Sequence, residues 1–359
     1  MVGATQTKTC SCRKIKKTTK ERSFYLQMIT WGIVANSHDA SIGVFDGHKP
    51  VWAGMAKDFS GKPNDPHLNW EMIQHLRIKE QLRPDKIVWY EYPRLKGLRQ
   101  WWAGQGLNWK ENNIPQYLSQ WNIDLPIEYT KHHLSHAAYG YYTYPTTNDN
   151  CHTRWAIVVL DSIGEFECFT IWQGLGGNLR KVYSQRYPHS IGLWYSAMTQ
   201  RLGLKPNAEE YKVCEMAAKG DPERFRKVIM DELFANGFKD LPAIKFNVNC
   251  HRGIGKWLPG VWTEQDLNDL AAGVQTVFED IIINISAWVK SYVEDDNVIF
   301  MGGCALNKPA IDKVRESGMF KNIYVPKNPG DPGSCLGAVF AKTKIHVDFK
   351  DNIWYNKHE

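Results

Sequence analysis

Residues 29–56 read ITWGIVANSHDASIGVFDGHKPVWAGMA, and this stretch decides the expected fold. An apolar strand from Ile29 is followed by a polar corner, a strand at Ser41–Phe45, an Asp46-Gly47 turn and a strand at Val51–Ala53. Asp-Gly between two apolar runs is a strong signal for a tight hairpin. The segment therefore predicts three consecutive strands of one sheet.

The same plan returns in residues 155–184, which read WAIVVLDSIGEFECFTIWQGLGGNLRKVYS. Strands are expected here at Trp155–Leu160, Phe166–Trp172 and Leu179–Tyr183, with Asp161 at the polar corner after the first of them. Repetition of one pattern at a distance indicates internal duplication. The chain is therefore expected to contain two related halves.

Between and after these segments, helices alternate with single strands, as is typical of α/β proteins. The expected elements are helices at Asn69–Leu82 and Thr263–Val293 and strands at Lys86–Tyr90, Ile127–Thr130, Val298–Met301 and Ile323–Val325. Two lobes, each a mixed sheet with flanking helices, suggest the duplicated actin-like or sugar-kinase-type ATPase fold, with nucleotide in the cleft between the lobes. An unrelated pair of α/β domains is the alternative. The expected division is a basic, disordered extension at 1–27, a first lobe at 28–154, a second lobe at 155–345 and a C-terminal tail at 346–359.

The composition of the 359 residues predicts a soluble globular protein, because 43% are hydrophobic and no apolar run approaches the roughly 18 residues that cross a bilayer. Residues 1–27 hold seven basic residues and one acidic residue, so the net charge of +6 falls entirely in that segment. The neutral remainder argues against nucleic acid as a partner. Eight cysteines without metal or disulfide spacing, and no secretory leader pattern, predict a cytoplasmic protein.

His132 and His136 are four residues apart in an expected helix, so both imidazoles can face one metal ion. An ordinary surface pair is the alternative. Asp161 and Asp331 are the candidates for further ligands, and two histidines with two carboxylates suit iron, manganese or zinc better than calcium.

Paired glycines at Gly302 and Gly303 follow an expected strand, where their backbone N–H groups can approach a phosphate or an adenosine closely. The turn at Gly330 offers a second close approach, although such turns are commonly structural. His38 lies in the corner of the first hairpin, where an imidazole can act as a general base near neutral pH. Its alternative role is to cap that corner by a hydrogen bond.

Taken in order, these segments resemble the NodU/CmcH family of carbamoyltransferases, the nodulation-factor and antibiotic-tailoring enzymes. The catalytic domain of that family is in turn similar to the protein that makes threonylcarbamoyladenosine in tRNA. The similarity runs from about Ile29 to Ala341. The matching motifs are His38-Asp39-Ala40-Ser41, His132-His133 with His136-Ala137-Ala138, Asp161 with Gly164-Glu165, Ser190 to Tyr195, Lys212-Val213, Gly302 to Asn307, and Gly330 to Gly333 with Leu336-Gly337-Ala338.

The resemblance implies that carbamoyl phosphate and ATP give carbamoyladenylate, whose carbonyl is attacked by a hydroxyl of a small-molecule, sugar or nucleoside acceptor. It implies a divalent metal, with iron as the first candidate and manganese or zinc as alternatives. The residues that it assigns are His132, His136, Asp161 and Asp331 to the metal, Asp39, Lys212, Gly302, Gly303, Asn307 and Gly330 to the nucleotide, and His38 and Lys62 to catalysis, with His38 as the base.

The sequence also departs from the family pattern. Lys57-Asp58-Phe59 stands in place of a Glu-Glu-Arg run, and Ser162 and Glu215 each replace a glycine. Full-sized members carry a C-terminal activating domain, whereas 17 residues follow Lys342. The chain is therefore expected to be the transfer domain alone, served by a separate carbamoyl-activating protein. The alternatives are a non-catalytic, regulatory nucleotide-binding protein and a transferase of the tRNA threonylcarbamoyladenosine type.

Overall fold

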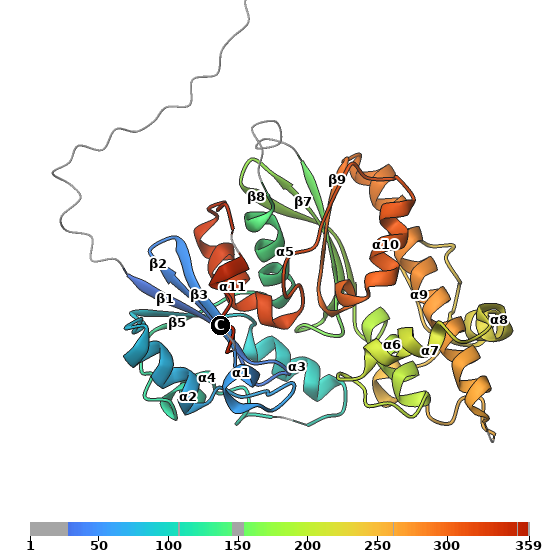
Figure 1. Cartoon of the computed structure of the whole chain (residues 1–359), viewed down its shortest axis with the longest axis horizontal. Helices are drawn as coiled ribbons and strands as arrows, with labels where there is room; N and C mark the ends of the chain where they lie inside the picture. Colours follow the sequence, from blue (N-terminus) through green and yellow to red (C-terminus); the bar gives the residue numbers. More distant parts are fainter. Residues whose placement is uncertain (1–27, 107, 146–153, 261, 350, 358–359) are drawn as a thin grey trace, which may run out of the picture.

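A computed structural model describes residues 28–106, 108–145, 154–260, 262–349 and 351–357, so the expected extension at 1–27 lies outside the described residues. Two five-stranded sheets form the frame of the molecule (Figure 1), with the orders β3-β2-β1-β4-β5 and β10-β9-β6-β7-β8. In each sheet the first three strands in sequence are antiparallel, and the two later strands run parallel to the first. The predicted duplication is therefore present in the strand order.

The strands agree closely with the predicted ranges. They are β1 (Ile29–Val34), β2 (Ser41–Asp46), β3 (Lys49–Met55), β4 (Lys86–Trp89), β5 (Ile127–Tyr129), β6 (Trp155–Leu160), β7 (Glu167–Leu175), β8 (Asn178–Arg186), β9 (Asn297–Met301) and β10 (Asn322–Tyr324). The α-helices are α1 (Lys57–Ser60), α2 (Trp70–Gln74), α3 (Pro93–Trp102), α4 (Ile114–Ser119), α5 (His132–Thr143), α6 (Ile191–Arg201), α7 (Glu210–Ala217), α8 (Pro222–Leu233), α9 (Glu264–Val293), α10 (Lys308–Glu316) and α11 (Ser334–Thr343).

Strand β6, in the middle of the second sheet, is buried on both faces. All six residues of β6 are buried, and they alternate between two hydrophobic cores: residues 155, 157 and 159 join the core shared with the first sheet, and residues 156, 158 and 160 join the core under α9. Strands that are buried on both faces are continuous hydrophobic runs rather than alternating ones. This explains why WAIVVL contains no polar residue.

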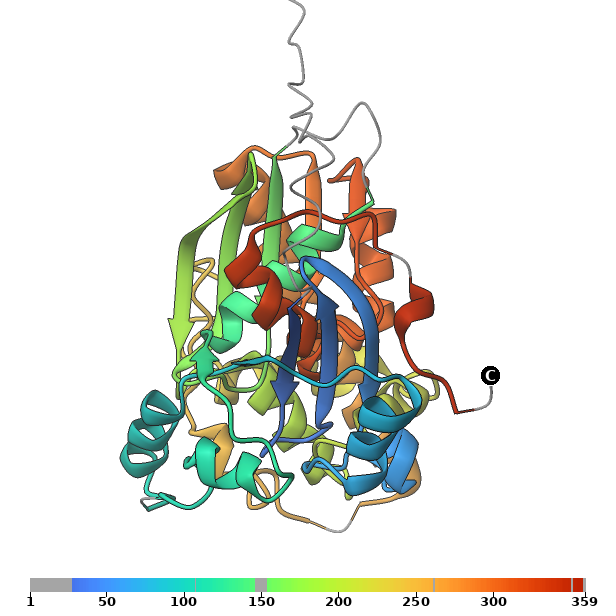
Figure 2. The same ribbon diagram turned by 90° about the vertical axis from the view of Figure 1, so that its left-hand side faces the viewer.

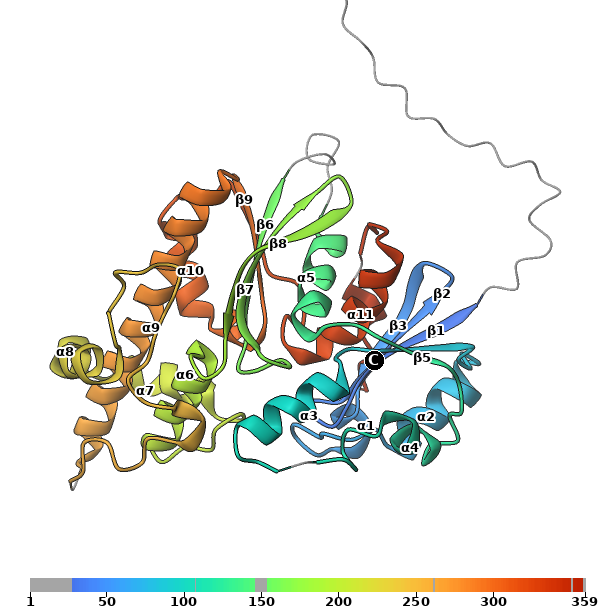
Figure 3. The same cartoon turned by 180° about the vertical axis from the view of Figure 1, so that it is seen from behind.

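Helices α5 and α11 lie between the two sheets (Figures 2 and 3). They pack on each other, α5 also contacts β6, and α11 also contacts β1. Glycine makes these contacts close, because a Cβ on Gly32 would lie 1.8 Å from the Cys335 carbonyl oxygen and one on Gly337 would lie 1.8 Å from that of Ser135. Although α11 falls within the expected second lobe at 155–345, it packs on the first sheet. The packing of α11 therefore crosses the lobe boundary that was predicted from the sequence. The predicted division into lobes at 28–154 and 155–345 stays a prediction.

The longest helix, α9, begins where the sequence predicts. Thr263 caps it and forms a reciprocal capping box with Asp266. By length and composition α9 could cross a membrane, but 67% of its most apolar window is buried inside the protein. It forms the centre of the second hydrophobic core.

One helix differs from expectation. The helix expected at Asn69–Leu82 is α2 followed by a π-helical turn at His75–Lys79, and it stops before Gln81, whose φ of 55° is incompatible with a right-handed helix. The tail expected at 346–359 docks on the first lobe, because Trp354 pairs with Ala53 and Tyr355 stacks on Phe59 with ring centroids 4.6 Å apart.

Candidate metal centre and active-site cleft

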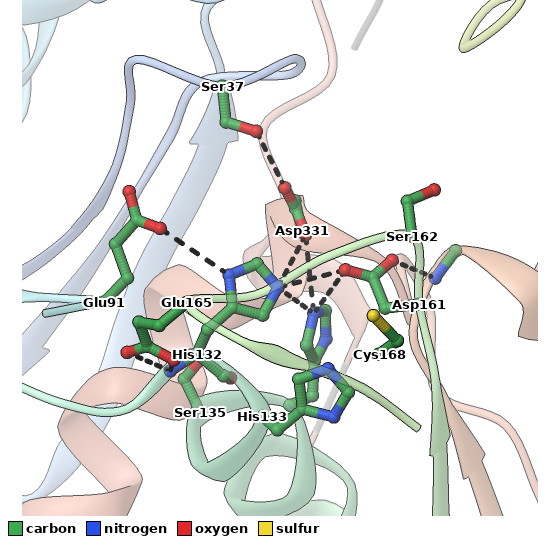
Figure 4. Close-up of polar contacts among 12 residues, drawn as sticks. Ser37, Glu91, His132, His133, Ser135, Asp161, Ser162, Glu165, Cys168 and Asp331 are labelled. Atoms are coloured by element: carbon green, nitrogen blue, oxygen red, sulfur yellow. Dashed lines mark hydrogen bonds and ion pairs between the residues drawn. The ribbon is translucent and has the colours of Figure 1, made fainter. Parts of the chain in front are cut away.

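Four buried side chains converge where the start of α5, the end of β6 and the turn before α11 meet (Figure 4). His132 and His136 lie in the first two turns of α5, Asp161 directly follows β6, and Asp331 begins the short turn that leads into α11. The packing of α5 and α11 between the sheets therefore brings together three segments that are far apart in the sequence.

The ligand atoms are close enough to share one ion. His132 Nε2 lies 3.1 Å from both Asp161 Oδ2 and His136 Nε2. Asp331 Oδ1 lies 3.3 Å from His132 Nε2 and 3.4 Å from His136 Nε2. Ligands bound to one transition-metal ion at about 2.1 Å lie roughly 3.0–3.4 Å apart at tetrahedral or octahedral angles. The observed spacings fit such an ion.

The hydrogen bonding of the cluster also fits a cation. Asp331 Oδ1 is buried and accepts no hydrogen bond within the described part of the chain. A buried acceptor without a donor costs free energy, so it calls for a partner such as an ion. The four residues that the sequence assigned to a metal could therefore hold one.

Two carboxylates outside the candidate ligand set lie next to His132. Its backbone N–H donates to Glu165 Oε1 at 3.1 Å, and the same oxygen accepts from the Tyr92 N–H at 2.9 Å. Glu91 Oε2 lies 4.0 Å from His132 Nδ1. Glu165 therefore fixes the backbone at the start of α5, whereas Glu91 lies near the His132 ring without a hydrogen bond to it.

The two candidate carboxylate ligands are held in the same way. The Ser37 hydroxyl donates to Asp331 Oδ2 at 3.0 Å, and the Gly303 N–H donates to Asp161 Oδ1 at 3.1 Å (Figure 4). Each aspartate therefore keeps one oxygen fixed by the protein and turns the other toward the histidines.

The charges of neighbouring side chains have more effect than burial on the pKa values of His132 and Asp331. Burial lowers the pKa of His132, but the neighbouring Asp331 and Asp161 outweigh burial and raise it well above its usual value. Burial raises the pKa of Asp331, but the histidines hold it well below its usual range. His133 points elsewhere, to Thr170 Oγ1 at 2.9 Å, and burial lowers its pKa to about 3. His133 is therefore neutral near pH 7.

A cavity of about 440 Å³ opens beside the cluster, and Asp161 lines it. This volume is in the usual range for a small-molecule site. The first lobe contributes His38, Asp39 and Asn64, whereas the second contributes residues of α6, α7, α9 and the segment from Gly303 to Pro309. The cavity is thus a cleft between the lobes.

His38 lies between the cavity and the cluster. Its Nδ1 is 3.3 Å from Asp39 Oδ2, and its Nε2 is 3.9 Å from Asp331 Oδ2. Burial lowers the pKa of His38, but the Asp39 hydrogen bond and the charges of Asp331 and Asp161 raise it to about 9. His38 is therefore protonated near pH 7 when the cluster is free of metal.

Some of the other expected site residues line the cavity, and some do not. Gly303 and Asn307 line the cavity, and Asn307 Nδ2 donates to Gln275 Oε1 at 3.0 Å. Gly302 precedes Gly303 in the chain but does not line the cavity. Three more residues assigned by resemblance do not line the cavity: Lys62, Lys212 and Gly330.

The two lysines are held on the surface. Lys62 is exposed, and Lys212 pairs with Glu209 at 2.6 Å on the outside of α7. The structure therefore does not bring either ammonium group into the cleft, and the functional roles of both lysines stay predictions.

Sequence reasoning named the start of α6 in the Ser190 to Tyr195 motif but missed the polar wall that α7 adds to the cleft. Glu210 accepts a hydrogen bond from the Ser196 hydroxyl at 2.9 Å, and Tyr195 donates from its hydroxyl to Gln275 Oε1 at 2.8 Å. Glu210, Tyr195 and Ser196 line the cavity together with Cys214. The aromatic pair at 194–195 was a visible signal, but no pattern indicated which face of α7 meets the cleft.

We expect Gly302→Ala to destabilise the fold by roughly 2–4 kcal/mol, because φ at Gly302 is 87° and a Cβ there would lie 2.1 Å from the Leu160 carbonyl oxygen. Thermal denaturation measures the effect. Gly303→Ala is the matched control, since its nearest neighbour would be Asp161 Oδ1 at 3.3 Å. Equal melting temperatures for the Gly302 variant and the parent would contradict the prediction.

The two mixed sheets with flanking helices define the actin-like, sugar-kinase-type ATPase fold. Full-length HypF in its phosphate- and nucleotide-bound form has a similar structure, with a TM-score of 0.54 at 10% identity, over 92% of this chain and 47% of that one. At this identity the likeness shows the fold alone.

A family model described as "Carbamoyltransferase N-terminus" matches residues 95–340, so the chain belongs to the carbamoyltransferase family. An uncharacterized protein of Synechocystis is 30% identical over 86% of this chain and 56% of its own length. Nodulation protein NolNO of Sinorhizobium fredii is 27% identical over 59% of this chain and 30% of its own length. The chain spans about half the length, or less, of these relatives.

Proposed function

We propose that the protein transfers a carbamoyl group from carbamoyladenylate to a hydroxyl of a small-molecule, sugar or nucleoside acceptor, with the help of a divalent metal. The observation that carries this proposal is the His132, His136, Asp161 and Asp331 cluster, which meets an interlobe cleft at Asp161, in a cleft wall that also contains His38. Family membership supports carbamoyl transfer as the chemistry.

The four cluster residues would hold the ion, with iron as the first candidate and manganese or zinc as alternatives. When bound, such an ion polarises a carbonyl or phosphoryl oxygen. His38 Nε2 takes the proton of the acceptor hydroxyl while the hydroxyl oxygen forms a bond to the carbamoyl carbon. The bond between that carbon and the phosphate oxygen breaks, and AMP leaves with the electrons of that bond. Asp39 holds Nδ1 of His38, which leaves Nε2 free on the side of the cluster.

The adenosine part of the donor belongs in the second lobe. Gly303, Asn307 and Tyr195 line that end of the cleft. A glycine lets a ligand approach the backbone closely, and an aromatic side chain suits an adenine or a ribose. This end of the cleft would therefore take the adenosine of carbamoyladenylate, for which ATP is the precursor.

We further propose that carbamoyl phosphate and ATP are converted to carbamoyladenylate by a domain or protein other than residues 28–357. The family match covers a part described as the N-terminus, and the relatives are longer than their match to this chain. The activated donor then has to reach the interlobe cleft from its site of synthesis.

The proposal is tested with metal-loaded protein, ATP, carbamoyl phosphate and Fe(II), in the presence and absence of co-purifying proteins. Mass spectrometry follows carbamoyladenylate, AMP and carbamoylated products from a panel of amino sugars, glycosides and nucleosides. We expect a carbamoylated acceptor when carbamoyladenylate is present. A protein that binds ATP and metal but never releases AMP from carbamoyladenylate would instead support the regulatory alternative.

The pH dependence of the metal-free protein is also predictable. The folded pKa of His38, about 9, exceeds the unfolded value near 6.5, so protonated His38 stabilises the fold below pH 6.5, and this contribution is lost as pH rises through 9. An NMR titration of the histidine rings should show it. Adding Zn²⁺ should lower the His38 pKa, because a cation offsets the charges of Asp161 and Asp331. A His38 pKa that zinc leaves unchanged would contradict this prediction.

A further inference from the structure

The corner between β1 and β2 contains an unused acceptor. Asp39 Oδ2 is paired with His38, but Asp39 Oδ1 is buried and accepts no hydrogen bond from any described residue. The nearest cation is Lys57, whose Nζ lies 3.9 Å away, which is longer than a hydrogen bond. Unsatisfied buried acceptors are rare in native proteins, so a donor from a bound ligand would complete the hydrogen bonding of this oxygen.

The backbone of this corner is shaped to present the side chain. Asp39 has a φ of 59°, in the left-handed region that residues other than glycine seldom adopt. The corner is fixed on both sides, because the N–H of Asn36 donates to the Pro66 carbonyl at 2.9 Å and that of Ala40 donates to the Asp65 carbonyl at 2.8 Å. Strained conformations that neighbours hold in place are concentrated at functional sites.

The position of Asp39 indicates which part of a ligand it meets. It lines the cleft next to His38, on the first-lobe wall, whereas the residues suited to adenosine lie on the second-lobe wall. The proposed base acts on a hydroxyl that attacks the carbonyl carbon. His38 and Asp39 line the cavity together, with His38 Nδ1 3.3 Å from Asp39 Oδ2, so a carbonyl carbon placed for attack beside His38 brings its remaining substituent toward the Asp39 carboxylate.

A carbamoyl carbon carries an NH₂ group, and an acetyl carbon carries a methyl group in the same place. An ionised carboxylate only accepts hydrogen bonds, and the carbamoyl NH₂ only donates them. A methyl group would leave Asp39 Oδ1 buried without a partner. We propose that Asp39 recognises the NH₂ group of the activated carbamoyl donor and thereby selects a carbamoyl over an acyl group. This inference rests on the proposed function and names the group of the donor that the site recognises.

The test uses two stable analogues of the donor, adenosine 5′-N-carbamoylsulfamate and adenosine 5′-N-acetylsulfamate, which differ only in NH₂ against CH₃. Calorimetry of the metal-loaded protein gives both dissociation constants without an acceptor. A hydrogen bond to a charged group contributes about 1.5–3 kcal/mol, so we expect the carbamoyl analogue to bind roughly 10- to 100-fold more tightly. Because the adenosine parts are identical, a general structural role of Asp39 would not change this ratio.

The informative variants are Asp39→Gly and Asp39→Asn, since both glycine and asparagine tolerate the left-handed backbone. In Asp39→Gly the two analogues should bind equally, mainly through loss of carbamoyl affinity. In Asp39→Asn most of the preference should be lost, because a neutral acceptor is weaker. Asn36→Gly is the matched control: it relaxes the other left-handed residue of the corner, with a φ of 60°, and should keep the full preference.

Equal affinities in the parent protein, or an undiminished preference in Asp39→Gly or Asp39→Asn, would overturn the role of Asp39 and leave the proposed function standing. Failure of the parent to bind either analogue would overturn the proposed function and this inference together.

Discussion

Asp161→Asn and His136→Gln should each yield a folded protein that no longer retains a metal ion. Both replacements keep the approximate shape of the side chain and remove one of four converging ligand atoms, all within 4.8 Å of one another. Changes behind a ligand typically cost 10- to 100-fold in metal affinity, so loss of a ligand should cost at least about 100-fold. Metal content after gel filtration, with iron, manganese and zinc supplied in turn, measures the effect.

His133→Gln is the matched control, because His133 lies on the same helix but bonds to Thr170 instead of facing the cluster. It should retain metal at the level of the parent protein. Circular dichroism separates loss of metal from loss of fold. If Asp161→Asn and His136→Gln both bind metal as the parent does, the assignment of the metal site is wrong.

His38→Gln should retain the donor and lose the transfer. Glutamine keeps a polar side chain in the corner but cannot take up a proton near neutral pH, so we expect kcat to fall by about 10²–10⁴. Binding of the carbamoylsulfamate analogue should be unchanged, because the His38 ring would act on the acceptor hydroxyl. Single-turnover AMP release with an acceptor present measures the rate.

The control for this variant is His48→Gln, since His48 lies in the exposed turn after β2. It should transfer at the parent rate. A His38→Gln protein with unchanged kcat would exclude His38 as the base, and one that fails to bind the analogue would place His38 in donor binding instead.

Much of the fold could be predicted because its signals are local. Hairpin turns, alternating apolar runs and the Thr263 cap act over a few residues, and the structure confirms the strands and the long helix at nearly the predicted bounds. The helix expected at Asn69–Leu82 was too long. Its end depends on the left-handed Gln81, and no sequence pattern there signals that conformation.

The candidate site was only partly predictable, for a related reason. The motifs named His132, His136, Asp161 and Asp331, and the structure brings these four together. Resemblance also named Lys62 and Lys212, which lie outside the cleft wall, and sequence reasoning missed the cleft face of α7. Which side of a surface helix faces a cleft depends on packing between lobes, and a single sequence does not encode that packing in any short pattern.

The sequence by itself determined the duplicated strand pattern, the pairing of His132 with His136 on one helix face and the charge neutrality of the chain after residue 27. Only the tertiary structure decided that Asp161 and Asp331 reach those histidines, that α11 packs on the first sheet, and that Asp39 Oδ1 lacks a partner. The physical reason is the distance along the chain over which each kind of interaction acts. Turns, caps and helix faces are set by neighbours within a few residues, whereas the meeting of distant segments depends on how closely α5 and α11 pack between the two sheets.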